Sequence, residues 1–150
     1  MNQNILILGA TGMLGQAMFK YFFKHSDYTV YGTLRDPSGL DSFDEEMKPY
    51  LLSNIDLLNH NNLLHVFAKT NPNVVINCVG LIKQLAASKD PLIVLPINAM
   101  LPHQLARETQ KINARLIHIS TDCVFSGAKG SYTESDNCDA TDLYGVSKKI

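Results

Sequence analysis

The sequence lacks an excess of charge of either sign. Lys and Arg together number 13 and Asp and Glu 14, so the formal net charge is -1. Surfaces that bind nucleic acids or anionic membranes normally show a basic excess, so we expect neither partner. No apolar stretch approaches the roughly 20 residues of a membrane-spanning helix. The first residues, MNQNILILGATG, also lack the basic segment of a signal peptide.

Cysteine and paired metal ligands are scarce as well. Cys78, Cys123 and Cys138 are odd in number, widely spaced and without a C-x-x-C pattern. This usage is typical of free thiols in a reducing, cytoplasmic compartment. The five histidines show no paired ligand spacing, so we expect no metal site. We interpret the acidic run 44–46 as a solvated surface.

The apolar residues that are present follow an alternating strand and helix pattern. Helical spacing of apolar residues predicts helices over 14–22, 63–68 and 97–112. In the first of these, the expected apolar face is Leu14, Ala17, Met18, Tyr21 and Phe22. Runs rich in apolar or β-branched residues predict strands at 5–8, 29–34, 51–55, 74–78 and 116–120. The alternation predicts one α/β domain over 1–150, with a doubly wound parallel sheet.

A glycine-rich turn lies between the first predicted strand and the first predicted helix. Its sequence is Gly9-Ala10-Thr11-Gly12-Met13-Leu14-Gly15, with the spacing G-x-x-G-x-x-G. Glycine lets the backbone turn tightly and approach a pyrophosphate, whose negative charge the helix N-terminus stabilises. The turn therefore predicts a nucleotide site, although three glycines can also form a simple turn.

Arg35 stands 20 residues beyond Gly15, at the end of the second predicted strand. An acidic residue there would accept a hydrogen bond from the ribose 2′-hydroxyl of NAD, whereas an arginine suits the 2′-phosphate of NADP. The pattern favours NADP(H) over NAD(H). Two alternatives stay open: Asp36 occupies the position instead, or Arg35 is a solvated surface residue.

Tyr144 and Lys148 are four residues apart in a predicted helix, so they share one helix face. Tyrosine is a poor acid at neutral pH, but a nearby cation stabilises the phenolate and brings the pKa of the tyrosine toward the working range.

Ser120-Thr121-Asp122 ends the fifth predicted strand, and Thr121 could donate a hydrogen bond to the substrate oxygen that Tyr144 would protonate. The alternative is a capping turn. The polar segment 126–142 is predicted to be a loop at the ligand-binding edge of the sheet.

Taken in order, these pieces resemble the extended short-chain dehydrogenase/reductases, most closely the dTDP-4-dehydrorhamnose reductase-like branch of sugar-nucleotide reductases. The resemblance covers essentially the whole chain. The chain departs from the usual pattern in two places: Cys123 stands where tyrosine is commoner, and 77–80 reads Asn-Cys-Val-Gly rather than Asn-Ala-Ala-Gly. The matching motifs are the glycine turn, Asp56-Leu57, Asn77-Cys78-Val79-Gly80, Asn98, Ser120-Thr121-Asp122-Cys123-Val124-Phe125-Ser126-Gly127 and Tyr144-Gly145-Val146-Ser147-Lys148.

The resemblance implies a Rossmann-type sheet with strand order 3-2-1-4-5. It implies that Thr121, Tyr144 and Lys148 form a catalytic triad, with Asn98 supporting the site. The implied cofactor residues are Gly9, Thr11, Gly12, Met13, Leu14, Gly15, Arg35, Asp56, Leu57, Cys78, Val79, Gly80, Tyr144 and Lys148.

The implied activity is NADPH-dependent reduction of a 4-keto sugar nucleotide in deoxysugar or cell-surface polysaccharide biosynthesis. One alternative is a sugar-nucleotide epimerase or dehydratase of the same fold. Another is a non-catalytic NADP-binding regulatory subunit, like that of methionine adenosyltransferase.

In the resembled family the chain continues well beyond Lys148 into a substrate region. We therefore expect 1–150 to be the cofactor-binding part of a longer enzyme, which binds NADPH but turns over no sugar nucleotide at a useful rate. Apolar surface left without its partner would favour self-association, so a homodimer is among the expected states.

Overall fold

The computed structural model describes residues 3–149 and divides them into two compact units. The first, called the sheet unit, comprises the described residues up to Val79 together with Gln104–Ile119. The second, called the loop unit, comprises Gly80–His103 together with the described residues from Ser120 onward.

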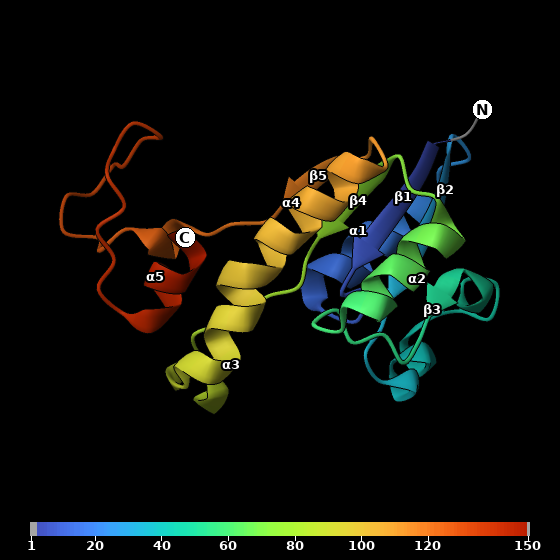
Figure 1. Cartoon of the computed structure of the whole chain (residues 1–150), viewed down its shortest axis with the longest axis horizontal. Helices are drawn as coiled ribbons and strands as arrows, with labels where there is room; N and C mark the ends of the chain where they lie inside the picture. The colour runs from blue at the N-terminus through green and yellow to red at the C-terminus, as the bar shows by residue number, and fades with distance from the viewer. Residues whose placement is uncertain (1–2, 150) are drawn as a thin grey trace. The chain divides into compact units, whose positions relative to one another are not determined.

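The sheet unit contains a five-stranded parallel sheet with the order β3-β2-β1-β4-β5, as predicted. Figure 1 shows β1, β2, β4 and β5 side by side, with α2 lying across the sheet. The helix α4 (Leu101–Lys111) begins in the loop unit and belongs to the sheet unit from Gln104. The other elements of the sheet unit are β1 (Gln3–Leu8), α1 (Met13–Phe23), β2 (Tyr28–Thr33), the 3-10 helices η1 (Pro37–Ser42) and η2 (Lys48–Tyr50), β3 (Leu51–Leu52), α2 (His60–Thr70), β4 (Val74–Asn77) and β5 (Arg115–His118).

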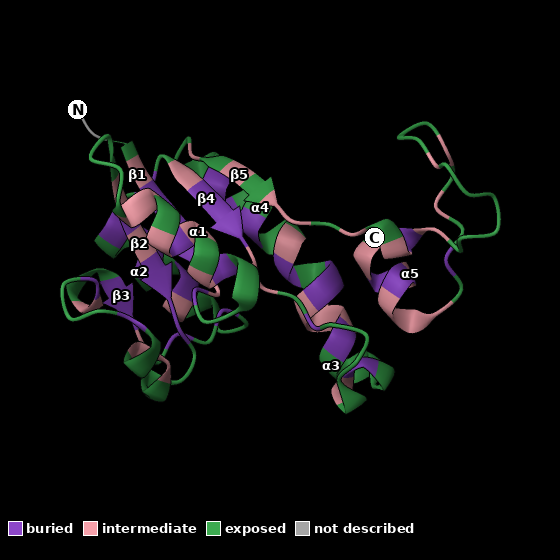
Figure 2. Ribbon diagram, turned by 180° about the vertical axis from the view of Figure 1, so that it is seen from behind, coloured by how far each residue is buried: buried purple, intermediate pink, exposed green. Residues whose placement is uncertain are grey.

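The central strands are buried on both faces, as their unbroken apolar runs predict. Ile5 pairs with Val30 on one side and Val74 on the other. Successive side chains of a strand point to opposite faces. Ile5 and Ile7 join the cluster that contains Phe19 of α1, and Leu6 and Leu8 are equally buried. Figure 2 shows much of β1 and β4 in the colour of buried residues.

The predicted apolar face of α1 is wrong in part. Phe19 is fully buried and Met18 and Phe22 pack on the core, but Leu14 and Tyr21 are 43% and 59% exposed. Ala17 is also exposed. The buried face is rotated because Gly15 lies against the backbone of the glycine turn, which decides which side of α1 faces the sheet.

The third strand is shorter than its predicted range of 51–55. Its parallel pairing with β2 covers only Gly32 with Leu51 and Thr33 with Leu52. The chain nevertheless stays attached, because Leu34 N–H donates to the Leu52 carbonyl and Ile55 N–H donates to the Leu34 carbonyl. Asp56 is therefore held near the end of β2.

The loop unit consists of short helices and irregular chain. The helix predicted over 97–112 is regular only from Leu101, as α4; its first residues belong to the π-helical turn η4 (Pro96–Met100), which follows α3 (Pro91–Leu95). Pro96 and Pro102 lack the N–H groups of a regular helix, and Leu101 N–H donates to the Pro96 carbonyl instead. The remaining helices are η3 (Ala86–Lys89), η5 (Asp122–Val124) and α5 (Leu143–Lys149). Residues 126–142 form neither helix nor strand, as predicted.

None of the helices within residues 3–149 combines the length and the apolar content needed to cross a membrane.

Candidate functional site

The glycine turn is closed so tightly that side chains are excluded from it. A Cβ on Gly15 would lie 2.2 Å from the Gly9 carbonyl oxygen, so only glycine fits at this position. Gly9 has φ +80°, in the left-handed region, and a Cβ there would approach Val79 Cγ2 to 2.9 Å. The turn is fixed to β2, because Gly9 N–H donates to Thr33 Oγ1 and Ala10 N–H donates to the Thr33 carbonyl.

The N-terminus of α1 is open to a ligand. Its N-cap is Gly12, which offers no side chain to the first-turn N–H groups, and the first turn contains no acidic residue. Met13 and Leu14 are 93% and 43% exposed, and Thr11 is also exposed. Free N–H groups and the positive end of the helix dipole attract anions such as phosphate.

Arg35 and Asp36 follow the end of β2 and are both exposed. The Asp36 carboxylate accepts hydrogen bonds from Ser38 N–H at 2.9 Å and from Ser38 Oγ at 2.8 Å. The Ser38 N–H and then the Ser38 hydroxyl are the main causes that hold the pKa of Asp36 below its ordinary value. Asp36 is thus engaged in capping η1.

Asp56 and Leu57, two of the implied cofactor residues, lie after β3. Asp56 is exposed, and one carboxylate oxygen accepts from Leu58 N–H at 3.0 Å, so the side chain closes its own turn. Leu57 is only 8% exposed. Burial beneath the turn gives Leu57 a clear packing role.

At the end of β4, Asn77 sets the direction of the chain. It is completely buried, and its Oδ1 accepts from Val79 N–H at 3.0 Å, while its amide nitrogen lies 3.1 Å from His118 Nδ1. The half-buried Cys78 lies with its sulfur 3.8 Å from Met18 Sδ. This side chain packs as a small apolar group, and its burial raises the pKa of the Cys78 thiol.

The loop unit brings Gly80, Asn98 and Lys148 together. A Cβ on Gly80 would lie 3.7 Å from Asn98 Oδ1 and 3.9 Å from Lys148 Nζ. Burial lowers the pKa of the Lys148 ammonium. Tyr144 is half-buried on the same helix, α5, one turn before Lys148. Two predicted catalytic side chains therefore share one helix face, beside a predicted cofactor residue.

Thr121 forms a capping turn, which was the alternative to a catalytic role for this residue. Its Oγ1 accepts from Cys123 N–H at 3.2 Å and donates to Asp122 Oδ1 at 3.3 Å, and it caps η5. This turn packs on α5, since a Cβ on Gly145 would lie 2.3 Å from the Cys123 carbonyl oxygen. The turn η5 that Thr121 caps is thus held against the helix that carries Tyr144.

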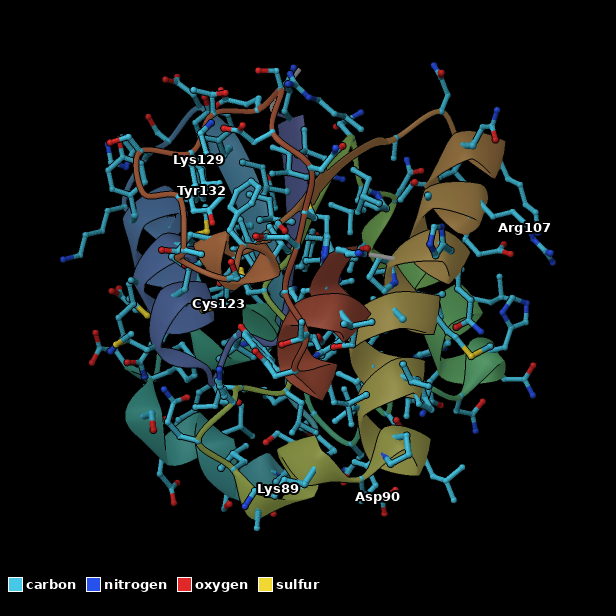
Figure 3. All side chains as sticks on the ribbon, turned by 90° about the vertical axis from the view of Figure 1, so that its left-hand side faces the viewer. Lys89, Asp90, Arg107, Cys123, Lys129 and Tyr132 are labelled. Atoms are coloured by element: carbon cyan, nitrogen blue, oxygen red, sulfur yellow. The ribbon has the colours of Figure 1, made fainter. Side chains whose placement is uncertain are left out.

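A cavity of about 410 Å³ opens in the loop unit beside this turn, and its wall combines aromatic, hydroxyl, carboxylate and thiol groups. The rings of Phe125 and Tyr132 are stacked, with centroids 4.4 Å apart. Figure 3 shows Lys129 next to Tyr132, and its Nζ lies 5.8 Å from that ring centroid. The lining residues are Asp122, Cys123, Phe125, Ser126, Gly127 and Tyr132.

Sequence reasoning missed the contacts that Asp142, Lys83 and Ser147 make around α5. Asp142 Oδ1 accepts from Gly145 N–H at 3.1 Å, and its other oxygen accepts from Lys83 Nζ at 3.1 Å. Lys83, which from its place after the fourth strand could be a surface lysine or meet a substrate phosphate, forms this ion pair. Aspartate is a preferred residue at the N-cap of a helix, where it accepts from the N–H group three residues later, so the sequence could have predicted that Asp142 caps the helix. Ser147 is fully buried, which no local pattern reveals.

Within residues 3–149, no three His, Cys, Asp or Glu side chains gather in a way that could hold a metal ion. The three cysteines are free thiols.

Comparison with known families decides the class of the protein. Residues 3–150 match the family model described as the RmlD substrate binding domain. The chain belongs to this family. The predicted resemblance to the dTDP-4-dehydrorhamnose reductase-like branch of the extended short-chain dehydrogenase/reductases is confirmed.

Three known proteins illustrate what this chain is similar to. The solved structure of dTDP-4-dehydrorhamnose reductase from Bacillus anthracis, in complex with NADP, matches with a TM-score of 0.77 and 27% identity over 99% of this chain and 47% of that one. UDP-glucuronic acid 4-epimerase from Bacillus cereus, in complex with NAD, has a TM-score of 0.80 and 25% identity over 98% and 49%. Methionine adenosyltransferase 2 subunit beta from Bos taurus is 30% identical over 147 residues, 98% of this chain and 41% of that protein.

This chain therefore spans less than half the length of these proteins. The similar proteins include sugar-nucleotide enzymes and a subunit of another enzyme, so the family alone does not choose between a catalytic and a regulatory role.

Proposed function

We propose that residues 1–150 form the NAD(P)-binding domain of an NADPH-dependent reductase that acts on a 4-keto sugar nucleotide. The observation that carries the proposal is the placement of the half-buried Lys148 beside Gly80, one helical turn from Tyr144. A lysine and a tyrosine at this spacing suit acid catalysis on a developing alkoxide. The similarity to the NADP-bound reductase supports the same choice.

The glycine turn fits a dinucleotide. Gly9 and Gly15 let the backbone close tightly, since a Cβ on either would clash with Val79 or with the Gly9 carbonyl oxygen, and the first turn of α1 carries no acidic residue. We assign pyrophosphate binding to this turn, with further contacts from the ends of β2, β3 and β4. The proposed contact residues are Gly9, Thr11, Gly12, Met13, Leu14, Gly15, Arg35, Asp56, Leu57, Cys78, Val79, Gly80, Tyr144 and Lys148. When bound, the reduced nicotinamide supplies the hydride that the keto carbon accepts.

NADP(H) is the proposed cofactor because of the contacts of Arg35 and Asp36, which follow the end of β2. The Asp36 carboxylate is engaged with Ser38, whereas Arg35 is an exposed cation at the predicted position. A guanidinium can form paired hydrogen bonds to a phosphate. This arrangement favours Arg35 over Asp36 as the residue that meets the ribose.

Three side chains of the loop unit are proposed to act on the substrate. Tyr144 protonates the oxygen of the 4-keto group as negative charge develops on it, and Lys148 stabilises the resulting phenolate and holds the nicotinamide ribose. Thr121 orients the carbonyl oxygen. Its hydroxyl proton is committed only to the long 3.3 Å bond to Asp122, and it can turn to the substrate while Oγ1 still accepts from Cys123 N–H.

The proposal is tested by two measurements on the purified chain and on its Tyr144→Phe variant. Fluorescence titration measures NADPH binding, and the absorbance of NADPH follows turnover when a 4-keto sugar nucleotide is added. NADPH binding by both proteins supports the assignment of the cofactor site. The turnover measurement is repeated on a protein in which this chain is extended to the length of the similar reductases, and turnover there that Tyr144→Phe abolishes supports the reductase. Absence of NADPH binding would contradict it. Turnover by the 150-residue chain alone, at an enzyme's ordinary roughly 1–10³ per second, would contradict the expected need for a longer chain.

A regulatory role is the second candidate, and the similarity to methionine adenosyltransferase 2 subunit beta is what favours it. The chain would then bind NADP(H) and a methionine adenosyltransferase without reducing a sugar nucleotide. Calorimetric titration with a methionine adenosyltransferase catalytic subunit separates the candidates. Saturable binding to that subunit, with no turnover of any 4-keto sugar nucleotide, would replace the reductase by this role.

A further inference from the structure

The helix that carries Tyr144 and Lys148, α5, is described over Leu143–Lys149. Side-chain contacts from elsewhere in the loop unit hold it in place. Asp142 accepts from Gly145 N–H at its start, and Lys149 Nζ donates to the Cys138 carbonyl at 3.1 Å near its end.

Ser147 supplies the buried contact of this helix. Its side chain is completely inaccessible, and its hydroxyl donates to the Tyr144 carbonyl at 2.7 Å. The same oxygen accepts from Asn98 Nδ2 at 3.2 Å. The bond to Tyr144 fixes the hydroxyl proton, so the lone pairs of Oγ are directed to the Asn98 amide.

Asn98 is itself held rigidly. It is 3% exposed in the π-helical turn η4. Its Oδ1 accepts from Leu81 N–H at 2.8 Å, and its Nδ2 donates to the Leu81 carbonyl at 3.0 Å. Both hydrogen-bonding ends of the amide are therefore in use, and the third bond is the one to Ser147. Buried polar groups that are fully satisfied in this way specify one arrangement of their neighbours.

We propose that Ser147 is a positioning residue for the Tyr144–Lys148 pair. Residues 144 and 148 share one face of α5, and Ser147 lies about 100° from Lys148 around the helix. Fixing Ser147 against Asn98 fixes the rotation of the helix, and with it the direction of the Tyr144 phenol and the placement of the Lys148 ammonium beside Gly80. The catalytic consequence of this rests on the proposed reductase function.

The surroundings of the Lys148 ammonium can be followed by its titration, without any turnover. Lysines are dimethylated with ¹³C-labelled formaldehyde, and the NMR signal of Lys148 is assigned by its loss in Lys148→Arg. In the unaltered chain this signal should titrate at lower pH than the exposed lysines, because burial lowers the pKa of Lys148. In Ser147→Ala the titration midpoint should move toward that of the exposed lysines, and Ser147→Thr, which keeps the hydroxyl, should restore it.

Ser88→Ala is the matched control. Ser88 is 5% exposed in the same unit, and its hydroxyl donates to the Lys83 carbonyl at 2.9 Å rather than to α5. The substitution removes the same atoms and the same kind of hydrogen bond. If Ser147→Ala does not fold, as judged by circular dichroism, Ser147→Cys keeps the side-chain size with a far weaker hydrogen-bonding group.

The outcomes separate the two proposals. A Lys148 midpoint unchanged by loss of the Ser147 hydroxyl, or moved equally by Ser88→Ala, overturns the positioning role. A moved midpoint supports it, even if the unaltered protein reduces no sugar nucleotide, in which case the reductase proposal alone fails. Where turnover is present, Ser147→Ala should lower kcat by about tenfold or more with little change in KM.

Discussion

In the sheet unit, Ile5 to Leu8 lie entirely inside the protein, whereas in the loop unit the exposed segment around Ser126 and Asp139 is joined mainly by polar side chains. Asp139 accepts from Ser126 N–H at 2.7 Å and from Ser126 Oγ at 2.6 Å. Most of the buried apolar side chains belong to the sheet unit, and the loop unit adds only a few, Val94 and Leu101 among them. One unit therefore rests chiefly on buried apolar area and the other on directed polar contacts.

This difference suits the roles that we propose for the two units. A non-directional apolar core gives the glycine turn and the strand ends a rigid support. Polar contacts in loops depend on pH and on individual residues, and such loops commonly carry ligand specificity. We expect the sheet unit to lose most from truncated apolar residues and the loop unit to respond to changes in charge.

The largest effect is expected from Phe19→Ala in the sheet unit. Phe19 is fully buried between Phe23 and Phe43, with ring centroids 6.0 and 5.5 Å away. Its truncation should lower the free energy of unfolding by about 3–5 kcal/mol, measured by urea denaturation. Tyr21→Ala on the same helix, where the side chain is 59% exposed, is the control and should change little. Similar losses for both variants would contradict the core assigned to α1.

The next effect concerns the cofactor. If Arg35 contacts the 2′-phosphate, Arg35→Ala should weaken NADPH binding by about 1.5–3 kcal/mol, measured by calorimetry, and leave NADH binding nearly unchanged. Arg115→Ala removes another exposed arginine of the sheet unit and serves as the control. Equal loss of affinity for both cofactors would place the 2′-phosphate contact elsewhere.

Acidification should loosen the loop unit locally. Hydrogen bonds from the Ser126 hydroxyl and N–H hold the pKa of Asp139 below its ordinary value, and the Lys129 ammonium and then Thr133 N–H do the same for Asp136. A carboxylate with a depressed native pKa stabilises the fold above its unfolded pKa, and this contribution is lost as pH falls through the native value.

The amide NMR signals of Ser126 and Thr133 should therefore shift below about pH 4, while those of Leu6 and Ile7 stay in place. Asp139→Asn should remove the change at Ser126. Simultaneous loss of all these signals would show that the two units unfold together.

The smallest effect is a difference in thiol reactivity. Burial raises the pKa of Cys78 in the sheet unit, and thiolate is the form that reacts with iodoacetamide. Cys78 should be alkylated more slowly than Cys138 of the loop unit when peptides are followed by mass spectrometry. In urea the two rates should become similar. Faster reaction of Cys78 in the native protein would contradict its burial against Met18.

Much of the fold could be read from local patterns. The apolar runs of β1 and β4 and the spacing of Gly9, Gly12 and Gly15 are properties of adjacent residues, so the strands and the turn were predictable. The same holds for Tyr144 and Lys148, because residues four apart on a helix share a face. The face of α1 was misjudged, since Leu14 and Tyr21 are apolar enough for a core but lie on the exposed side.

The sequence by itself determined the parallel sheet, its strand order by family resemblance, the glycine turn and the spacing of the proposed catalytic pair. Only the tertiary structure decided that Asp36 is engaged with Ser38, that Lys148 is half-buried beside Gly80, and that Ser147 is bonded to Asn98. Spacing along the chain sets which side chains share a face. Burial and hydrogen bonding depend on residues far apart in the chain, as Asn98 and Ser147 are, and no local pattern reports which of them meet.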